Sequence, residues 1–109
     1  MEKKQWLYRL QPSRPDMLAT GPTPEESALI GKHFDYLKEL TAKGTVLMAG
    51  RTLTTDADSF GIVIYLAENE NAARSLFSED PAVKAGVFMG DFYPFSVALL
   101  SSDWQKKKA

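Results

Sequence analysis

The chain contains one histidine, His33, and its position is the feature that most suggests chemistry. At about 100° per residue, the helix predicted over residues 24–43 carries an apolar arc made of Leu29, Ile30, Phe34, Leu37 and Leu40. His33 lies inside this arc. A buried polar group without a partner costs about 1–3 kcal/mol, so both ring nitrogens need hydrogen bonds. The sequence therefore indicates either a core histidine bonded to a backbone carbonyl or an imidazole oriented for acid–base chemistry.

Two arginines and a serine are further candidates for contact with a small ligand. Arg9 lies in the first predicted strand and Arg51 at the end of the second, and either could clamp an anionic group with two parallel hydrogen bonds. The alternative for both is an ordinary solvated arginine. Ser13 lies in a long loop that could close over a pocket or simply cover the surface. The chain has no cysteine, and no serine stands in a G-x-S-x-G context, so no nucleophile motif is present.

The composition is that of one globular domain spanning residues 1–109, with 44% hydrophobic and 25% charged residues. A net charge of −1 gives no footprint for nucleic acid. One histidine and no cysteine argue against a structural metal site, and we expect no metal and no organic cofactor. The apolar runs are too short to cross a membrane, and the first ten residues lack the apolar core of a secretory signal. We therefore expect a cytoplasmic protein.

The hydrophobic pattern predicts six elements in the order β-α-β-β-α-β. Strands are expected over residues 6–10, 46–53, 60–67 and 86–100, the last kinked near Pro94. Helices are expected over 24–43 and 69–78, with one further turn over 81–85. Thr23 and Glu26 form a capping box before the first helix, and Gly44 ends it. The Pro- and Gly-rich segment 12–22 is long enough to act as a lid.

This order favours an α+β fold of the ferredoxin-like type, with a four-stranded antiparallel sheet and both helices on one face. In the third strand Ile62 and Ile64 alternate with Val63 and Tyr65, so both faces of the sheet are apolar. The last strand shows the same pattern. Helices can cover only one face, and an exposed apolar sheet face is unusual in soluble monomers. We therefore expect a homodimer that packs sheet to sheet.

Several short motifs resemble the YciI-like (YCII-related) family over nearly the whole chain. They are the string His33-Phe34-Asp35-Tyr36-Leu37-Lys38-Glu39-Leu40, then Gly44, Ala49-Gly50, Phe60-Gly61, Asp80-Pro81, Gly86 and Pro94-Phe95. The resemblance implies a dimeric α/β-barrel fold and an active-site His–Asp pair, which falls here on His33 and Asp80. One departure stands out, because the family usually continues Ala-Gly with proline and Arg51 follows here.

Helix geometry is compatible with this pair. If the two helices run side by side, His33 lies about 13 Å along the first and Asp80 about 15 Å along the second, at 1.5 Å per residue. Asp80 could then accept a hydrogen bond from one imidazole nitrogen and leave the other facing a pocket, as in general acid–base catalysis. The alternative is that Asp80 bonds only to backbone groups beside Pro81.

Two functions from different classes follow. One is a cofactor-independent enzyme in which His33 and Asp80 perform acid–base chemistry on a small cyclic or aromatic substrate, of isomerase, lyase or dehydrochlorinase type; the resemblance suggests the last of these. The other is a non-catalytic small-ligand-binding or accessory protein with the same pocket. The deciding feature is whether the second nitrogen of His33 opens onto a cavity.

Overall fold

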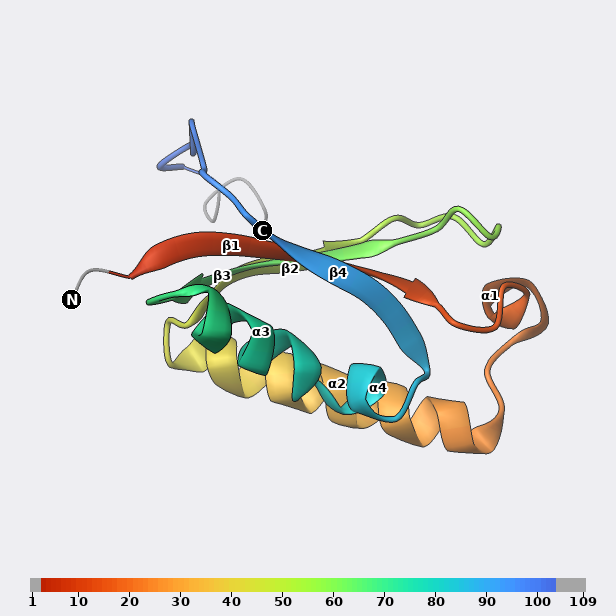
Figure 1. The fold of residues 1–109 in the computed structure, drawn as a ribbon. Helices are drawn as coiled ribbons and strands as arrows, with labels where there is room; N and C mark the ends of the chain where they lie inside the picture. Colours follow the sequence, from red (N-terminus) through yellow and green to blue (C-terminus); the bar gives the residue numbers. More distant parts are fainter. Residues whose placement is uncertain (1–2, 104–109) are drawn as a thin grey trace.

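The structure is a computed structural model that describes residues 3–103. Its elements are β1 (Lys4–Pro12), α1 (Met17–Thr20), α2 (Pro24–Ala42), β2 (Val46–Arg51), β3 (Gly61–Ala67), α3 (Glu70–Ser78), α4 (Pro81–Lys84) and β4 (Phe88–Pro94). Figure 1 shows α2, α3 and α4 on the same side of the sheet. The predicted β-α-β-β-α-β order is present, the further turn expected over 81–85 is α4, and α1 is an additional short helix.

The four strands form one antiparallel sheet in the order β2-β3-β1-β4, which is the ferredoxin-like arrangement. Alternate side chains of β1 point toward the helices, and these are Trp6, Tyr8 and Leu10. They pack against inward-facing residues of β3 and against Leu37 of α2 to form the core. The sheet therefore brings the middle of β1 directly beneath the helices.

Helix α2 begins as the sequence predicts. The Thr23 side chain accepts a hydrogen bond from the Glu26 backbone, and the Glu26 carboxylate accepts one from the Thr23 backbone. The helix ends before Gly44, whose φ of 79° is easily adopted only by glycine. Both ends of the helix that carries His33 are thus fixed by local sequence.

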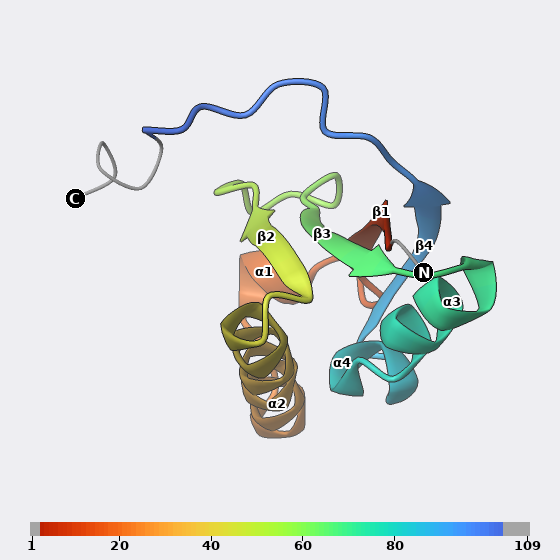
Figure 2. The same ribbon diagram turned by 90° about the vertical axis from the view of Figure 1, so that its left-hand side faces the viewer.

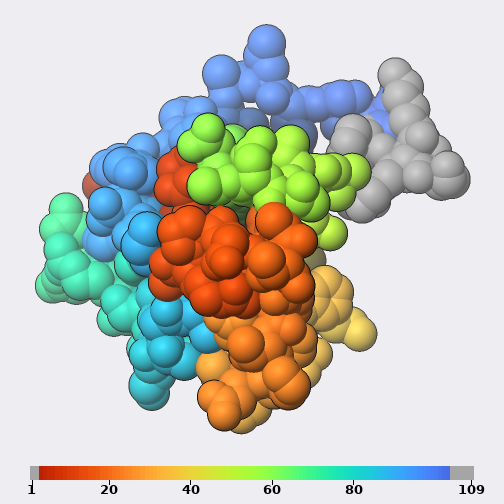
Figure 3. Space-filling view, turned by 90° about the vertical axis from the view of Figure 1, so that its right-hand side faces the viewer, coloured from red at the N-terminus to blue at the C-terminus, as the bar shows by residue number. Residues whose placement is uncertain are grey.

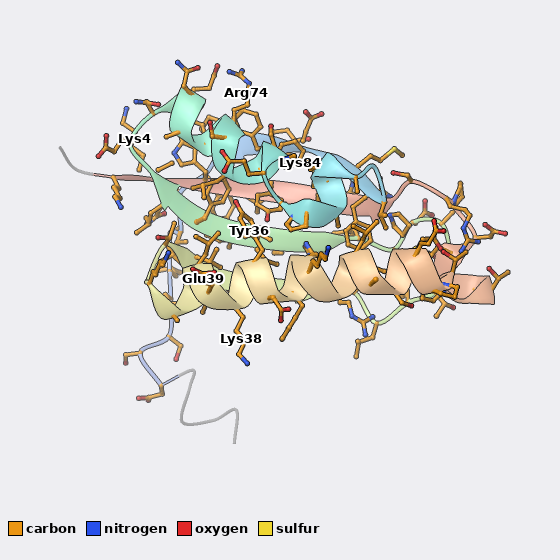
Figure 4. The ribbon with its side chains drawn as sticks, turned by 90° about the horizontal axis from the view of Figure 1, so that it is seen from below. Lys4, Tyr36, Lys38, Glu39, Arg74 and Lys84 are labelled. Atoms are coloured by element: carbon orange, nitrogen blue, oxygen red, sulfur yellow. The ribbon has the colours of Figure 1, made fainter. Side chains whose placement is uncertain are left out.

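The apolar arc of α2 is narrower than predicted. Leu37 is buried, whereas Phe34 is 64% exposed, because the sheet does not cover that side of the helix. Figure 4 shows Tyr36 pointing from α2 toward α3, while Lys38 points away from the domain. The Tyr36 hydroxyl donates to the Leu76 carbonyl of α3 at 2.7 Å. This bond links the two helices that the chain connects through β2 and β3.

The predicted last strand, residues 86–100, is too long. The ladder of β4 ends at Pro94. Beyond it the Phe95 amide donates to the Gln5 carbonyl, but the Val97 amide donates to the Gln5 side chain instead of to a strand. Figure 2 shows the segment after β4 leaving the sheet edge and passing over the face without helices. Likewise β2 ends at Arg51 instead of Leu53, where the turn toward β3 begins.

The sheet face opposite the helices carries exposed apolar side chains. Met48, Met89 and Tyr93 are 41%, 56% and 48% exposed. The segment beyond β4 adds Leu99 and Leu100, which are almost fully solvent-accessible. The two-sided apolar pattern of the sequence is therefore present in three dimensions. None of the helices within residues 3–103 is both long enough and apolar enough to cross a membrane.

Candidate active site

His33 and Asp80 form a hydrogen-bonded pair at the junction of α2 and α4. The Nδ1 atom of His33 lies 2.7 Å and 2.8 Å from the two carboxylate oxygens of Asp80. Asp80 is fully buried and the His33 side chain is 16% exposed. The structure thus brings the two residues together as expected. Asp80 follows the end of α3 at Ser78 and caps α4, the further helical turn that the sequence predicts.

The Asp80 carboxylate is held by two further donors. Its Oδ1 atom accepts from the Ala82 backbone amide at 3.0 Å, and its Oδ2 atom accepts from the Tyr8 hydroxyl at 2.7 Å. Burial raises the pKa of Tyr8 well above its ordinary value, and the nearby charge of Asp80 raises this pKa further. Tyr8 is therefore a permanent donor to Asp80. Asp80 thus both caps the backbone of α4 and binds His33, so its bonds are not limited to backbone groups.

This arrangement fixes the orientation and the proton of the imidazole. A carboxylate can only accept, so Nδ1 of His33 is the donor, and in the neutral ring Nε2 keeps its lone pair. Phe88 packs edge-on against the ring at 5.2 Å between centroids. Among residues 3–103 no group is bonded to Nε2. Nε2 is thus the nitrogen able to take up a proton.

His33 lines a cavity of about 380 Å³ between α2 and the ends of β2 and β3. Most of the lining is apolar, and it comes from Leu10, Pro12, Leu18, Ile30, Phe34, Leu37, Ala49, Gly50, Phe60, Gly61, Ile62, Val63 and Phe88. The polar lining residues are His33, Arg51, Thr52 and Ser59. An apolar cavity with a few polar groups is the usual form of a small-molecule site. In the described part of the chain, no three histidine, aspartate or glutamate side chains group together as metal ligands.

The other predicted ligand-binding residues are divided by the sheet. Arg51 lines the cavity. Arg9 alternates with the inward residues of β1, so it lies on the opposite face, where its guanidinium stacks on Phe60 at 4.4 Å. Ser13 is exposed and is not part of the cavity wall, and its backbone amide bonds to the Val87 carbonyl. The structure does not bring Arg9 or Ser13 to His33.

A bulge in β2 explains why Arg51 reaches the cavity. The register of β2 against β3 shifts between Val46 and Met48. Val46 therefore faces the helices, and so do Ala49 and Arg51, although regular alternation from Val46 would point Arg51 to the other face. Sequence pattern alone does not reveal this inserted residue.

The segment between β1 and α2 lies at one end of the cavity. Figure 3 shows it between the β2–β3 turn and the start of α2. Met17 of α1 is buried, and Leu18 lines the cavity. Arg14 donates to both carboxylate oxygens of Glu26, at 2.7 Å and 3.2 Å. These bonds, together with that of the Thr23 backbone, lower the pKa of Glu26 to about 2.

We expect Arg14→Gln to loosen this segment. Removing the bidentate link should raise amide hydrogen exchange of residues 13–20 by about 2–5-fold, since exposed ion pairs contribute little individually. In the wild type the same loosening should appear only in acid, because a lowered Glu26 pKa keeps the link intact above pH 4.5 and loses it as the pH falls toward about 2. Arg74→Gln, which breaks an exposed pair with Glu70 on α3, is the matched control. If hydrogen exchange is unchanged in Arg14→Gln, the Arg14–Glu26 link does not hold this segment in place.

The chain matches a known protein family over most of its length. The YCII-related domain matches residues 6–90. The chain belongs to the YCII-related domain family. The matched range includes Tyr8, His33, Arg51 and Asp80, so the whole candidate site lies within the family domain. None of the curated proteins compared with the chain matches it.

A solved structure shows the same fold. This YCII-related chain resembles 5-chloro-2-hydroxyhydroquinone dehydrochlorinase (TftG) from Burkholderia phenoliruptrix AC1100, with a TM-score of 0.59 and 23% identity, over 84% of this chain and 93% of that one. That structure is a complex with 2,5-dihydroxybenzoquinone. The match to SnoaB, a cofactor-independent oxygenase from Streptomyces nogalater, covers 94% of this chain and 99% of SnoaB, with 8% identity and a TM-score of 0.47. This chain therefore shares the fold of TftG.

Proposed function

We propose that this YCII-related protein is a cofactor-independent acid–base enzyme that moves a proton on a small ring compound. The observation that carries the proposal is the His33 imidazole, bonded through Nδ1 to a buried carboxylate while the same side chain lines an apolar cavity. A histidine that served packing alone would not need a cavity beside it. The ligand-binding alternative shares the cavity but makes no use of the Asp80 charge.

The chemistry assigned to the pair follows from its hydrogen bonds. Nε2 of His33 accepts a proton from the substrate, and the resulting imidazolium is stabilised by the adjacent Asp80 carboxylate. Tyr8 and Ala82 hold that carboxylate in place, so the ring keeps one tautomer and one orientation. His33 then returns the proton to another atom of the substrate. The net result is isomerisation, or elimination when a leaving group departs.

The cavity favours a compact substrate. Its volume of about 380 Å³ is near the lower end of small-molecule pockets, and its wall is mainly apolar and includes the aromatic residues Phe34 and Phe88. A monocyclic ring with hydroxyl groups fits this lining. For a chlorinated trihydroxybenzene the steps balance without an external oxidant. A hydroxyl proton moves to the ring carbon that bears chlorine, chloride leaves with its bonding electrons, and a second hydroxyl loses its proton to give a quinone.

The test is proton transfer itself, measured on a defined panel. The panel contains 1,2,4-trihydroxybenzene, 5-chloro-2-hydroxyhydroquinone and a simple aromatic lactone, chosen because the proposed site needs a ring with an acidic proton. NMR in deuterated water follows deuterium entry into ring positions, and an ion electrode follows chloride. We expect acceleration for at least one compound, abolished by His33→Gln. Equal rates for wild type and His33→Gln across the panel would leave only the ligand-binding function.

We further propose that the protein works as a homodimer in which the sheets face each other. The exposed Met48, Met89 and Tyr93 supply an apolar contact surface, and an interface of this kind exceeds roughly 2,000 Å². Light scattering should report twice the chain mass of 12.1 kDa at micromolar concentration. Met89→Asp places a charge in this interface and should produce monomers, whereas Lys38→Glu on the outer side of α2 should not. A wild-type mass of 12.1 kDa would refute the dimer.

A further inference from the structure

Arg51 is a cation on an apolar cavity wall. It is the last residue of β2 and pairs with Gly61 of β3. It is one of the residues that line the cavity beside His33. Within residues 3–103, none of the ion pairs closer than 4.0 Å involves Arg51. Its guanidinium therefore presents up to five N–H donors to a ligand that the rest of the wall can hold only by apolar contact.

The neighbouring Thr52 provides a second donor through a chain of hydroxyl groups. Thr54 donates to the Thr52 oxygen at 2.9 Å, and Thr54 lies 2.6 Å from the hydroxyl of Ser59, which is 2% exposed. A hydroxyl has one hydrogen, so Ser59 must be the donor to Thr54. Thr52 also accepts from the Phe60 amide at 3.1 Å.

The direction of the hydrogen bonds among these hydroxyl groups decides what Thr52 can do. Its oxygen receives two hydrogen bonds, from Thr54 and Phe60, while its own hydrogen has no acceptor in the described part of the chain. Thr52 lines the cavity beside Arg51. An oxygen that accepts twice is polarised toward donation of its remaining hydrogen. The strand wall thus offers two adjacent kinds of donor.

We infer that Arg51 and Thr52 form an anion-binding wall that holds one ionised oxygen of a planar ring, such as a phenolate or enolate. The inference rests on the proposed function, which it deepens, because loss of a hydroxyl proton to His33 leaves such an oxyanion. One guanidinium and one hydroxyl match a single charge on one oxygen. A phosphate monoester would bring about two charges into a wall that is otherwise apolar.

Binding of two matched probes tests the wall without turnover. The probes are 4-nitrophenol, at a pH where the free compound is ionised, and nitrobenzene, which has the same ring and nitro group without the oxygen. Calorimetry gives both affinities, and the visible band of 4-nitrophenolate reports its ionisation when bound. We expect the wild type to prefer the anion by at least about 10-fold, the range of a hydrogen bond to a charged group.

Single substitutions distinguish anion binding by Arg51 and Thr52 from a general effect of the protein's charge. Arg51→Gln should weaken 4-nitrophenolate binding by about 10–100-fold and change nitrobenzene binding by less than about twofold. Thr52→Val should weaken the anion by about 3–10-fold, and Thr52→Ser should restore it. Arg9→Gln removes the same charge on the opposite face of the sheet and should leave the anion preference intact.

Specific outcomes overturn the inference. They are a wild type that binds neither probe or binds both equally, an Arg51→Gln variant that loses both probes alike, and equal effects of Arg9→Gln and Arg51→Gln. The proposed function fails separately. An intact anion preference with no effect of His33→Gln on proton transfer refutes the enzyme and keeps the wall. A His33-dependent reaction without anion preference refutes the wall and keeps the enzyme.

Discussion

His33→Gln is expected to lower the rate of proton transfer by about 10²–10⁴-fold, the usual contribution of a positioned general base. Glutamine is of similar size and can still donate to the Asp80 carboxylate, but its amide cannot accept a proton at neutral pH. The change should therefore act on chemistry more than on folding. Asp35→Asn, two residues away on the outer side of α2, is the matched control and should leave the rate unchanged.

Asp80→Asn should give a comparable loss for a different reason. In the wild type the Ala82 amide and the Tyr8 hydroxyl donate to different carboxylate oxygens, so the single oxygen of asparagine can replace only one of these acceptors. The substitution also removes the charge that stabilises an imidazolium. An amide NH₂ directed at Nδ1 also forces the proton of His33 onto Nε2, where it blocks uptake of a substrate proton. NMR can observe this directly, because the chain has one histidine and hence one set of imidazole signals.

Together, the two variants distinguish a catalytic role of the His33–Asp80 pair from a role in shaping the cavity. We expect the wild-type imidazole to show an Nδ1–H tautomer and Asp80→Asn to show the Nε2–H tautomer, with the rate falling in parallel. If the tautomer changes while the rate stays the same, Asp80 does not act through His33. If His33→Gln retains the wild-type rate with a compound of the panel, the imidazole is not the base for that reaction.

The sequence predicts the helices and strands that carry the site better than it predicts the contacts between them. Capping by Thr23 and termination at Gly44 are local events, so both ends of α2 are readable from a few residues. The position of His33 on the inner side of α2 follows from helical spacing. These predictions need no knowledge of the tertiary fold.

What the sequence does not reveal depends on distant contacts. Tyr8 is 72 residues from Asp80, and only the position of β1 beneath α4 brings its hydroxyl to the carboxylate. The one available signal is that a tyrosine between two inward apolar residues, Trp6 and Leu10, needs a buried acceptor. The choice between Arg9 and Arg51 depends on the bulge in β2, which a pattern with a period of two cannot show.

Asp80→Ala is expected to have the largest effect on stability, with a loss of about 3–5 kcal/mol in the free energy of unfolding. The substitution leaves the Tyr8 hydroxyl and the Ala82 amide, both buried, without an acceptor, and each unmet donor costs about 1–3 kcal/mol. The Nδ1–H group of the partly exposed His33 adds a smaller cost. For a domain of this size the midpoint of thermal unfolding should fall by more than about 10 °C.

The double variant Tyr8→Phe/Asp80→Ala shows whether unmet hydrogen bonding is the cause. Tyr8→Phe removes the stranded donor together with its demand for an acceptor, so the double variant should recover about 1–2 kcal/mol relative to Asp80→Ala alone. Denaturant unfolding of the four proteins of this cycle measures the coupling. If the double variant is no more stable than Asp80→Ala, the loss comes from the cavity left by the side chain. Recovery would show that the hydrogen bond from Tyr8 to this carboxylate contributes to stability. A carboxylate held in this way is the condition for His33 to keep a single orientation.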